Sequence, residues 1–180
     1  MLDIIASFLG WLLIACQAWS VKYHFNVEKM PPGAKVISSL VIGFGVLLVY
    51  LAFTFEQPQT AQIVGSVLLL GSLALFWRTI AESRKAKLLA AFDENLPHGL
   101  LTTGPYRFVR HPFYTSYILH WVGWAIAAWN PWAIVAPIAM VTTYWVAARD
   151  EEAKFDRTEL SEAYRSYRAS TGRFFPRLMK

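Results

Sequence analysis

Residues 112–148 read PFYTSYILHWVGWAIAAWNPWAIVAPIAMVTTYWVAA, a stretch that decides the fold because it contains no Asp, Glu, Lys or Arg. It consists of two apolar segments, Pro112 to Trp129 and Pro131 to Ala148, joined only by Asn130. So short a link predicts an antiparallel helical hairpin whose arms are just long enough to cross a bilayer. Pro131 suits the first turn of the second arm, whereas Pro137 is expected to kink that arm.

Three longer apolar segments precede the hairpin, namely Leu2 to Val21, Val36 to Phe55 and Ala61 to Ala81. Together with a hydrophobic content of 56%, they exclude an ordinary soluble globule. The sequence therefore predicts an all-α integral membrane protein with five transmembrane helices. No basic residue precedes the first apolar run, so we expect this run to remain as a helix instead of acting as a cleaved signal peptide.

The basic residues predict the orientation in the membrane. The loop after the second segment contains Glu56 and no basic residue, whereas the first loop and the region after the third segment are rich in lysine and arginine. The positive-inside rule then places the N-terminus outside and the first loop, the active site and the C-terminus in the cytosol. Because these residues flank apolar segments, the net charge of +5 does not indicate a nucleic-acid partner. The basic residues of the first loop and of the region after the third segment are Lys22, Lys29, Lys35, Arg78, Arg84, Lys85 and Lys87.

The single cysteine, Cys16, lies in an apolar run. It excludes an internal disulfide and a metal site built from several cysteines, and we expect no metal. Its expected role is packing.

The tail from Glu151 to about Ala169 carries Leu160, Ala163, Tyr164 and Tyr167 at the spacing of one helical face. We expect one helix here, lying along the membrane or packing back over the hairpin. Thr171 and Gly172 should end it, and residues 174–176 could tuck an aromatic end into the protein.

Chemistry is expected where the hairpin begins and ends. Arg110 and His111 precede Pro112, which can start a helix without losing a hydrogen bond, and Glu151 and Glu152 follow the second arm. If the arms are antiparallel, both sets of residues meet on the cytosolic side. The simpler alternative for Arg110 is an interfacial arginine that reaches lipid phosphates.

The ordered combination of these residues resembles the superfamily of isoprenylcysteine carboxyl methyltransferases and phospholipid methyltransferases. The resemblance covers roughly residues 96–176, and one departure is Ser116, where the family usually has glycine. The matching residues are His98, Leu100, Thr102, Gly104, Tyr106, Arg110, His111, Pro112, Tyr114, Glu151, Glu152, Tyr164, Tyr167 and Pro176.

The resemblance implies a membrane-helix region over 1–95 and a catalytic region over 96–180 that binds S-adenosylmethionine in a cytosol-facing pocket. Catalytic roles would fall to Arg110 or Arg149, which could hold an anionic acceptor group. If the acceptor were an amine or thiol, His111 or Glu151 could serve as the base. The cofactor-binding residues would be His98, Leu100, Gly104, Tyr106, His111, Pro112, Tyr114 and Glu152.

The predicted function is methyl transfer from S-adenosylmethionine to a lipophilic acceptor in the membrane, foremost an isoprenylcysteine-type carboxylate. Three alternatives stay open. The same fold could methylate an amine head group or a thiol, the chain could be an NADPH-dependent sterol-type reductase, or it could bind lipids without catalysis. Beyond the acceptor and membrane lipids, the sequence specifies no partner and no oligomeric state.

Overall fold

The computed structural model describes residues 1–25, 32–84 and 99–177. Every regular element in these ranges is helical, which confirms the predicted all-α class, and the only extended pairing among them is an isolated bridge between Val109 and Gly172. The elements are α1 (Leu2–Trp19), the π-helical turn η1 (Ser20–His24), α2 (Pro32–Thr54), α3 (Gln59–Ser83), the 3-10 turn η2 (Gly104–Arg107), α4 (Pro112–Ala128), the 3-10 turn η3 (Pro131–Ile134), α5 (Val135–Phe155) and α6 (Ser161–Ser170).

Within the described part of the chain, four helical segments are long and apolar enough to cross a membrane. They are Leu2–His24, Gly33–Thr54, Gln59–Ser83 and Pro131–Phe155. The remaining apolar helix, α4, has 17 residues and is shorter than these four. The prediction of five spans therefore stays a prediction, because it depends on whether this short helix crosses the bilayer.

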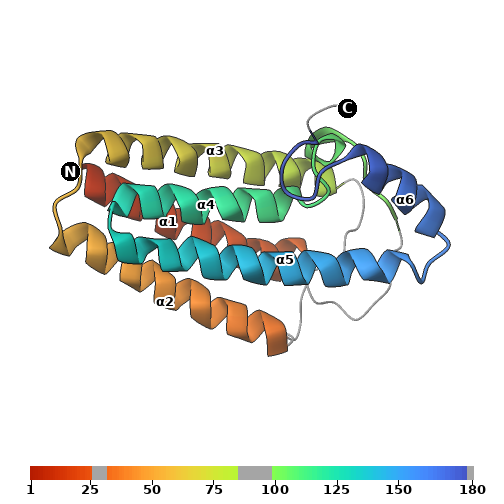
Figure 1. The fold of residues 1–180 in the computed structure, drawn as a ribbon, viewed down its shortest axis with the longest axis horizontal. Helices are drawn as coiled ribbons and strands as arrows, with labels where there is room; N and C mark the ends of the chain where they lie inside the picture. Colours follow the sequence, from red (N-terminus) through yellow and green to blue (C-terminus); the bar gives the residue numbers. More distant parts are fainter. Residues whose placement is uncertain (26–31, 85–98, 178–180) are drawn as a thin grey trace.

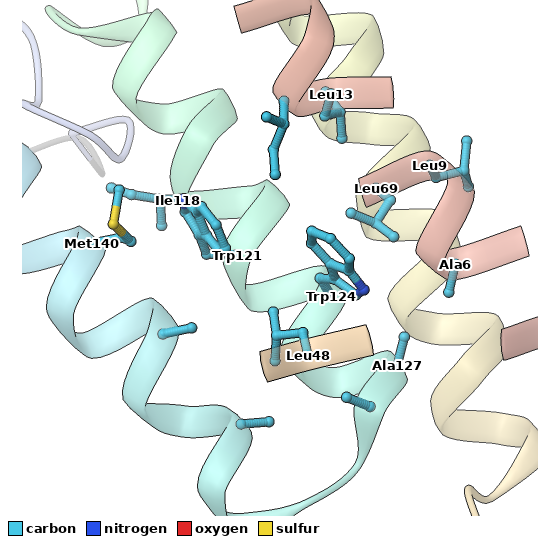
Figure 2. Packing of buried hydrophobic residues seen from close by; sticks show 14 of the residues in the cluster. Ala6, Leu9, Leu13, Leu48, Leu69, Ile118, Trp121, Trp124, Ala127 and Met140 are labelled. Atoms are coloured by element: carbon cyan, nitrogen blue, oxygen red, sulfur yellow. The ribbon is translucent and has the colours of Figure 1, made fainter. Parts of the chain in front are cut away.

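Helix α4 lies at the centre of the bundle, between α3 and α5 (Figure 1). Its side chains Trp121 and Trp124 have no exposed surface and form the middle of the core. Figure 2 shows them among residues of α1, α2, α3 and α5, such as Leu13, Leu48, Leu69 and Met140. A central helix buried on so many sides can hold its first residues in a fixed position.

The hairpin between α4 and α5 turns through Trp129, which has a left-handed backbone (φ 36°), and Asn130. The side chain of Asn130 accepts a hydrogen bond from the backbone N–H of Trp132 and so caps the turn. The predicted interior kink at Pro137 is wrong. The chain is 3-10 helical from Pro131 and becomes α-helical at Val135, which puts Pro137 in the first turn of α5, where proline is tolerated.

The prediction of one continuous tail helix is also wrong, because α5 runs on to Phe155 and α6 begins only at Ser161. The hydroxyl of Thr158 bonds the carbonyl of Phe155 and accepts from the N–H of Leu160, so it competes with helical hydrogen bonding. The predicted end of the tail helix is confirmed, since α6 stops at Ser170. The predicted tuck of residues 174–176 is confirmed for Phe174, which is buried, and is wrong for Phe175 and Pro176, which are exposed.

The tail after α6 packs back onto the start of α4. The backbone N–H groups of Arg110 and His111 donate to the carbonyls of Gly172 (2.8 Å) and Arg173 (3.1 Å), and the hydroxyl of Thr115 donates to the carbonyl of Phe174 (2.9 Å). Figure 1 shows α6 at the end of the molecule opposite the N-terminus. The C-terminal segment is thereby tied to the residues for which the sequence predicts chemistry.

Candidate active site

The carboxylate of Glu152 is the hub of a buried ionic cluster at the end of α5. Its Oε1 accepts hydrogen bonds from Arg110 Nε and Arg173 Nε and lies near His111 Nε2, each at 3.1 Å, and its Oε2 accepts from Arg173 Nη2 at 2.9 Å. The side chain of Glu152 is only 3% exposed and that of Arg110 8% exposed. So many donors on one buried carboxylate fix the positions of all three partners.

A second carboxylate, Glu151, lies on the other side of the His111 ring. Its Oε2 is 3.5 Å from His111 Nδ1, and its Oε1 accepts a short hydrogen bond from the hydroxyl of Tyr114. The side chain of Glu151 is 29% exposed, so this carboxylate is open to solvent or ligand where Glu152 is not. With a carboxylate at each ring nitrogen, His111 is placed to donate two hydrogen bonds as an imidazolium.

Burial pushes the pKa of the His111 imidazole down, but the hydrogen bonds to Glu151 and Glu152 push it up more strongly, and the net pKa lies above the ordinary value. The cluster then holds three positive groups, Arg110, His111 and Arg173, against two carboxylates. It therefore carries a net positive charge when His111 is protonated, and this charge favours an anionic ligand group.

We expect the stability of the protein to depend on the protonation of His111. A pKa raised on folding stabilises the native state fully below the unfolded value of about 6.5, and this stabilisation is lost as the pH rises through the folded pKa. The melting temperature in detergent should therefore fall from pH 6 towards pH 9. In His111→Gln the fall should be smaller, and an equally steep fall in that variant would contradict the assignment.

The local sequence explains why these groups meet. His111 precedes α4 with a non-helical backbone (φ −123°, ψ 66°), and Pro112 starts the helix. The antiparallel hairpin returns α5 to the same end, as the sequence predicts. Arg110 is held further by a short hydrogen bond from Nη1 to the carbonyl of Thr171. Arg110 is thus directed into the protein and away from lipid phosphates.

The turn that precedes α4 contributes other predicted residues. Gly104 has a positive φ of 58°, a backbone conformation that favours glycine, and a Cβ there would also displace the side chain of Glu82, which it would meet at 2.8 Å. Leu100 is half-buried before this turn, and the carbonyl of buried Tyr106 accepts a hydrogen bond of 2.6 Å from the hydroxyl of Tyr167. Burial raises the pKa of Tyr167 to about 12, so its phenol stays protonated and can donate. His98 lies outside the described residues.

Aromatic rings flank the cluster on the α4 and α5 side. The Tyr114 ring stacks on Tyr144 at a centroid distance of 5.3 Å and on His111 at 5.6 Å, and Tyr117 lies 5.6 Å from Tyr144. Tyrosine faces attract cations through the ring quadrupole, an interaction worth about 0.5 to 2 kcal/mol. Tyr114 and Tyr144 are buried, and His111 and Tyr144 both stack on the Tyr114 ring, so the ionic cluster borders a buried aromatic layer.

Arg149, the remaining predicted acceptor residue, pairs with none of the described residues of the cluster, although it shares the Trp145 ring with Arg173. Its side chain is exposed, and the guanidinium carbon lies 5.9 Å from the centre of the Trp145 ring. His120, deeper in α4, is also separate, since its Nδ1 pairs with the side-chain amide of Gln17 at 3.2 Å. Ser116 bonds the carbonyl of Phe113 within its own helix, so its hydroxyl is occupied there.

Sequence reasoning missed Arg173. Its contacts with Glu152 depend on the tail folding back over α4, and a lone arginine after Thr171 and Gly172 carries no periodic or motif signal. The one available indication was the predicted tuck of the neighbouring Phe174, which brings residue 173 towards the site.

Comparison with known families places these residues in a wider context. The family model described as phospholipid methyltransferase matches residues 60–165, a segment that runs from α3 into α6 and contains Arg110, His111, Glu151 and Glu152. A comparison with curated proteins finds no match. The matched segment starts well before the predicted domain boundary at residue 95, which stays a prediction. The family match covers more than half of the chain, and four helices of its described part are long and apolar enough to cross a membrane, so this chain is an integral membrane protein of the phospholipid methyltransferase family.

Proposed function

We propose that this protein transfers a methyl group from S-adenosylmethionine to a lipophilic acceptor in the membrane, and that the acceptor group is a carboxylate of the isoprenylcysteine type. The family supports methyl transfer. The observation that carries the proposal is the ionic cluster around Glu152, which adjoins tyrosine rings at the end of the apolar hairpin.

The residues of the cluster fit the charges of S-adenosylmethionine, which supplies an activated methyl group on a sulfonium. In this proposal the tyrosine layer lies beside the sulfonium, Glu151 is exposed enough to accept from an ammonium group, and the arginines suit a carboxylate. His98, Leu100, Gly104, Tyr106, His111 and Pro112 complete the proposed cofactor site. In this proposal Glu152 contributes by holding Arg110, His111 and Arg173 in place.

Displacement at a sulfonium needs alignment and exclusion of water more than a strong acid or base. The buried cluster and its aromatic border can supply both. An imidazolium cannot accept a proton, so the raised pKa of His111 argues against a base at that position. A carboxylate acceptor needs no base. An amine or thiol acceptor would need one, and Glu151 would be the remaining candidate. This contrast favours the carboxylate.

The acceptor would enter from the bilayer. Arg149 directly follows the apolar part of α5, which ends at Ala148, and its exposed guanidinium is placed to pair with an anionic group at that boundary. Arg110 is committed to Glu152 and Thr171. We therefore assign the acceptor contact to Arg149.

We also propose that this end of the molecule faces the cytosol and that the N-terminus lies outside. Lys22 follows α1, Lys35 lies in the first turn of α2, and Arg84 follows α3. These helix ends lie at the end of the bundle that carries the cluster. Glu56 lies at the opposite end. The basic residues thus lie at one end of the bundle and an acidic residue at the other, and the positive-inside rule assigns the basic end to the cytosol.

Calorimetric titration of the folded protein in detergent with S-adenosylhomocysteine, and with NADPH in parallel, tests the cofactor. We expect the first ligand to bind and the second not to bind. Binding of NADPH alone would support a reductase instead, and binding of neither would support a non-enzymatic lipid-binding protein.

The acceptor is tested by methyl transfer from labelled S-adenosylmethionine to a farnesylated cysteine analogue, an amine lipid and a lipophilic thiol. We expect label only in the first product, as a methyl ester that mild base releases. Base-stable label in the amine or thiol product would contradict the assignment of a carboxylate.

A further inference from the structure

Arg173 binds the carboxylate of Glu152 through one edge of its guanidinium group. Nε donates to Oε1 at 3.1 Å and Nη2 donates to Oε2 at 2.9 Å, so two parallel hydrogen bonds join the two planar groups. A bidentate pair of this kind fixes the orientation of the guanidinium as well as its position. The side chain is therefore ordered without any ligand.

The terminal edge of the same guanidinium, formed by Nη1 and the second N–H of Nη2, is not used by Glu152. Nη1 of Arg173 has no hydrogen-bond partner among the residues that the structure describes, and the side chain is 22% exposed. Its guanidinium carbon lies 5.7 Å from the centre of the Trp145 ring, which supports one face of the group. Arg173 thus presents free donors at the border between the buried cluster and solvent.

A carboxylate is the ligand group that this edge suits. The second edge of a guanidinium matches the two oxygens of a carboxylate, and the cluster behind it carries a net positive charge while His111 is protonated. Because the first edge is already fixed on Glu152, binding an anion at the second edge costs little additional side-chain entropy.

We propose that Arg173 binds the carboxylate of the amino-acid part of S-adenosylmethionine. This inference rests on the proposed function. Arg173 shares the Glu152 carboxylate with His111 and Arg110, which places it beside the proposed cofactor site, whereas Arg149 pairs with none of the described residues of the cluster and is proposed to contact the acceptor. Arg173 also lies beyond residues 60–165, so the family match does not assign it.

The test compares two ligands that differ only in the part that Arg173 would bind. S-adenosylhomocysteine has the amino-acid group, and 5′-methylthioadenosine has the same adenosine thioether without it. In Arg173→Ala we expect the Kd for S-adenosylhomocysteine to rise about tenfold or more, and the Kd for methylthioadenosine to change less than about twofold. The ratio of the two affinities does not depend on the fraction of protein that is folded.

The matched control is Arg177→Ala, which removes the same charge from the same tail. The exposed Arg177 bonds the carbonyl of Ala169 and should leave both affinities unchanged. Arg173→Lys should give an intermediate loss for S-adenosylhomocysteine, since lysine keeps the charge but not the two-edged geometry.

Three results would overturn the inference while leaving the proposed function intact. They are an unchanged Kd for S-adenosylhomocysteine in Arg173→Ala, an equal weakening of both ligands, and tighter binding of S-adenosylhomocysteine. The last would mean that Arg173 competes with the cofactor. Failure of the unaltered protein to bind S-adenosylhomocysteine would instead contradict the proposed function itself.

Discussion

The Glu152→Gln variant is expected to lose about 3 kcal/mol or more of unfolding free energy, which corresponds to a fall in melting temperature of roughly 6 to 12 °C. Glutamine keeps the shape of the side chain but not its charge, so the buried Arg110 and the half-buried Arg173 would lose the counterion that they share. The N–H groups of the glutamine amide would also face the N–H groups of the arginines, and two donors cannot form a hydrogen bond with each other. Thermal unfolding in detergent at pH 7 measures the effect.

The same substitution should weaken the binding of S-adenosylhomocysteine, because the positions of His111 and Arg173 depend on the carboxylate. Glu151→Gln is the matched control for stability. Glu151 is 29% exposed and contacts only His111 and Tyr114 within the described chain, so its loss should cost about 1 kcal/mol or less. Equal melting temperatures for the Glu152 variant and the unaltered protein would show that Glu152 is not the hub of the cluster.

The sequence predicted the helical class and the hairpin because both depend on local patterns. Apolar segments of sufficient length indicate membrane helices. A link of one residue between two such helices indicates an antiparallel hairpin. The meeting of His111 with Glu151 and Glu152 follows from that arrangement, and the structure places the facing atoms 3.1 to 3.5 Å apart.

Other features depend on contacts that no local pattern specifies. The break between α5 and α6 arises where the side chain of Thr158 bonds the backbone. The inward direction of Arg110 and the hydrogen bonds from Arg173 to Glu152 both require the tail to fold back over α4. The number of spans depends on α4, whose 17 residues lie at the lower limit for crossing a bilayer.

The close approach of α3 to α4 is the second place where a single substitution should have a large effect. A Cβ at Gly65 would lie 2.5 Å from the carbonyl oxygen of Gly123 and 2.6 Å from the backbone nitrogen of Ala127. Backbone atoms cannot rotate away, so Gly65→Ala would push the two helices apart. We expect a loss of about 1 to 3 kcal/mol, measured as a lower melting temperature in detergent.

Gly71→Ala is the control, since it lies on the same helix and a Cβ there would meet no atom within 4 Å. Alanine has the better helix propensity, so this variant should keep or slightly raise the melting temperature. Methyl transfer should fall in the Gly65 variant as well, because His111 directly precedes α4 and a shift of the helix would move the cluster. If both variants unfold at the same temperature, then the contact between Gly65 and Gly123 does not set the distance between α3 and α4.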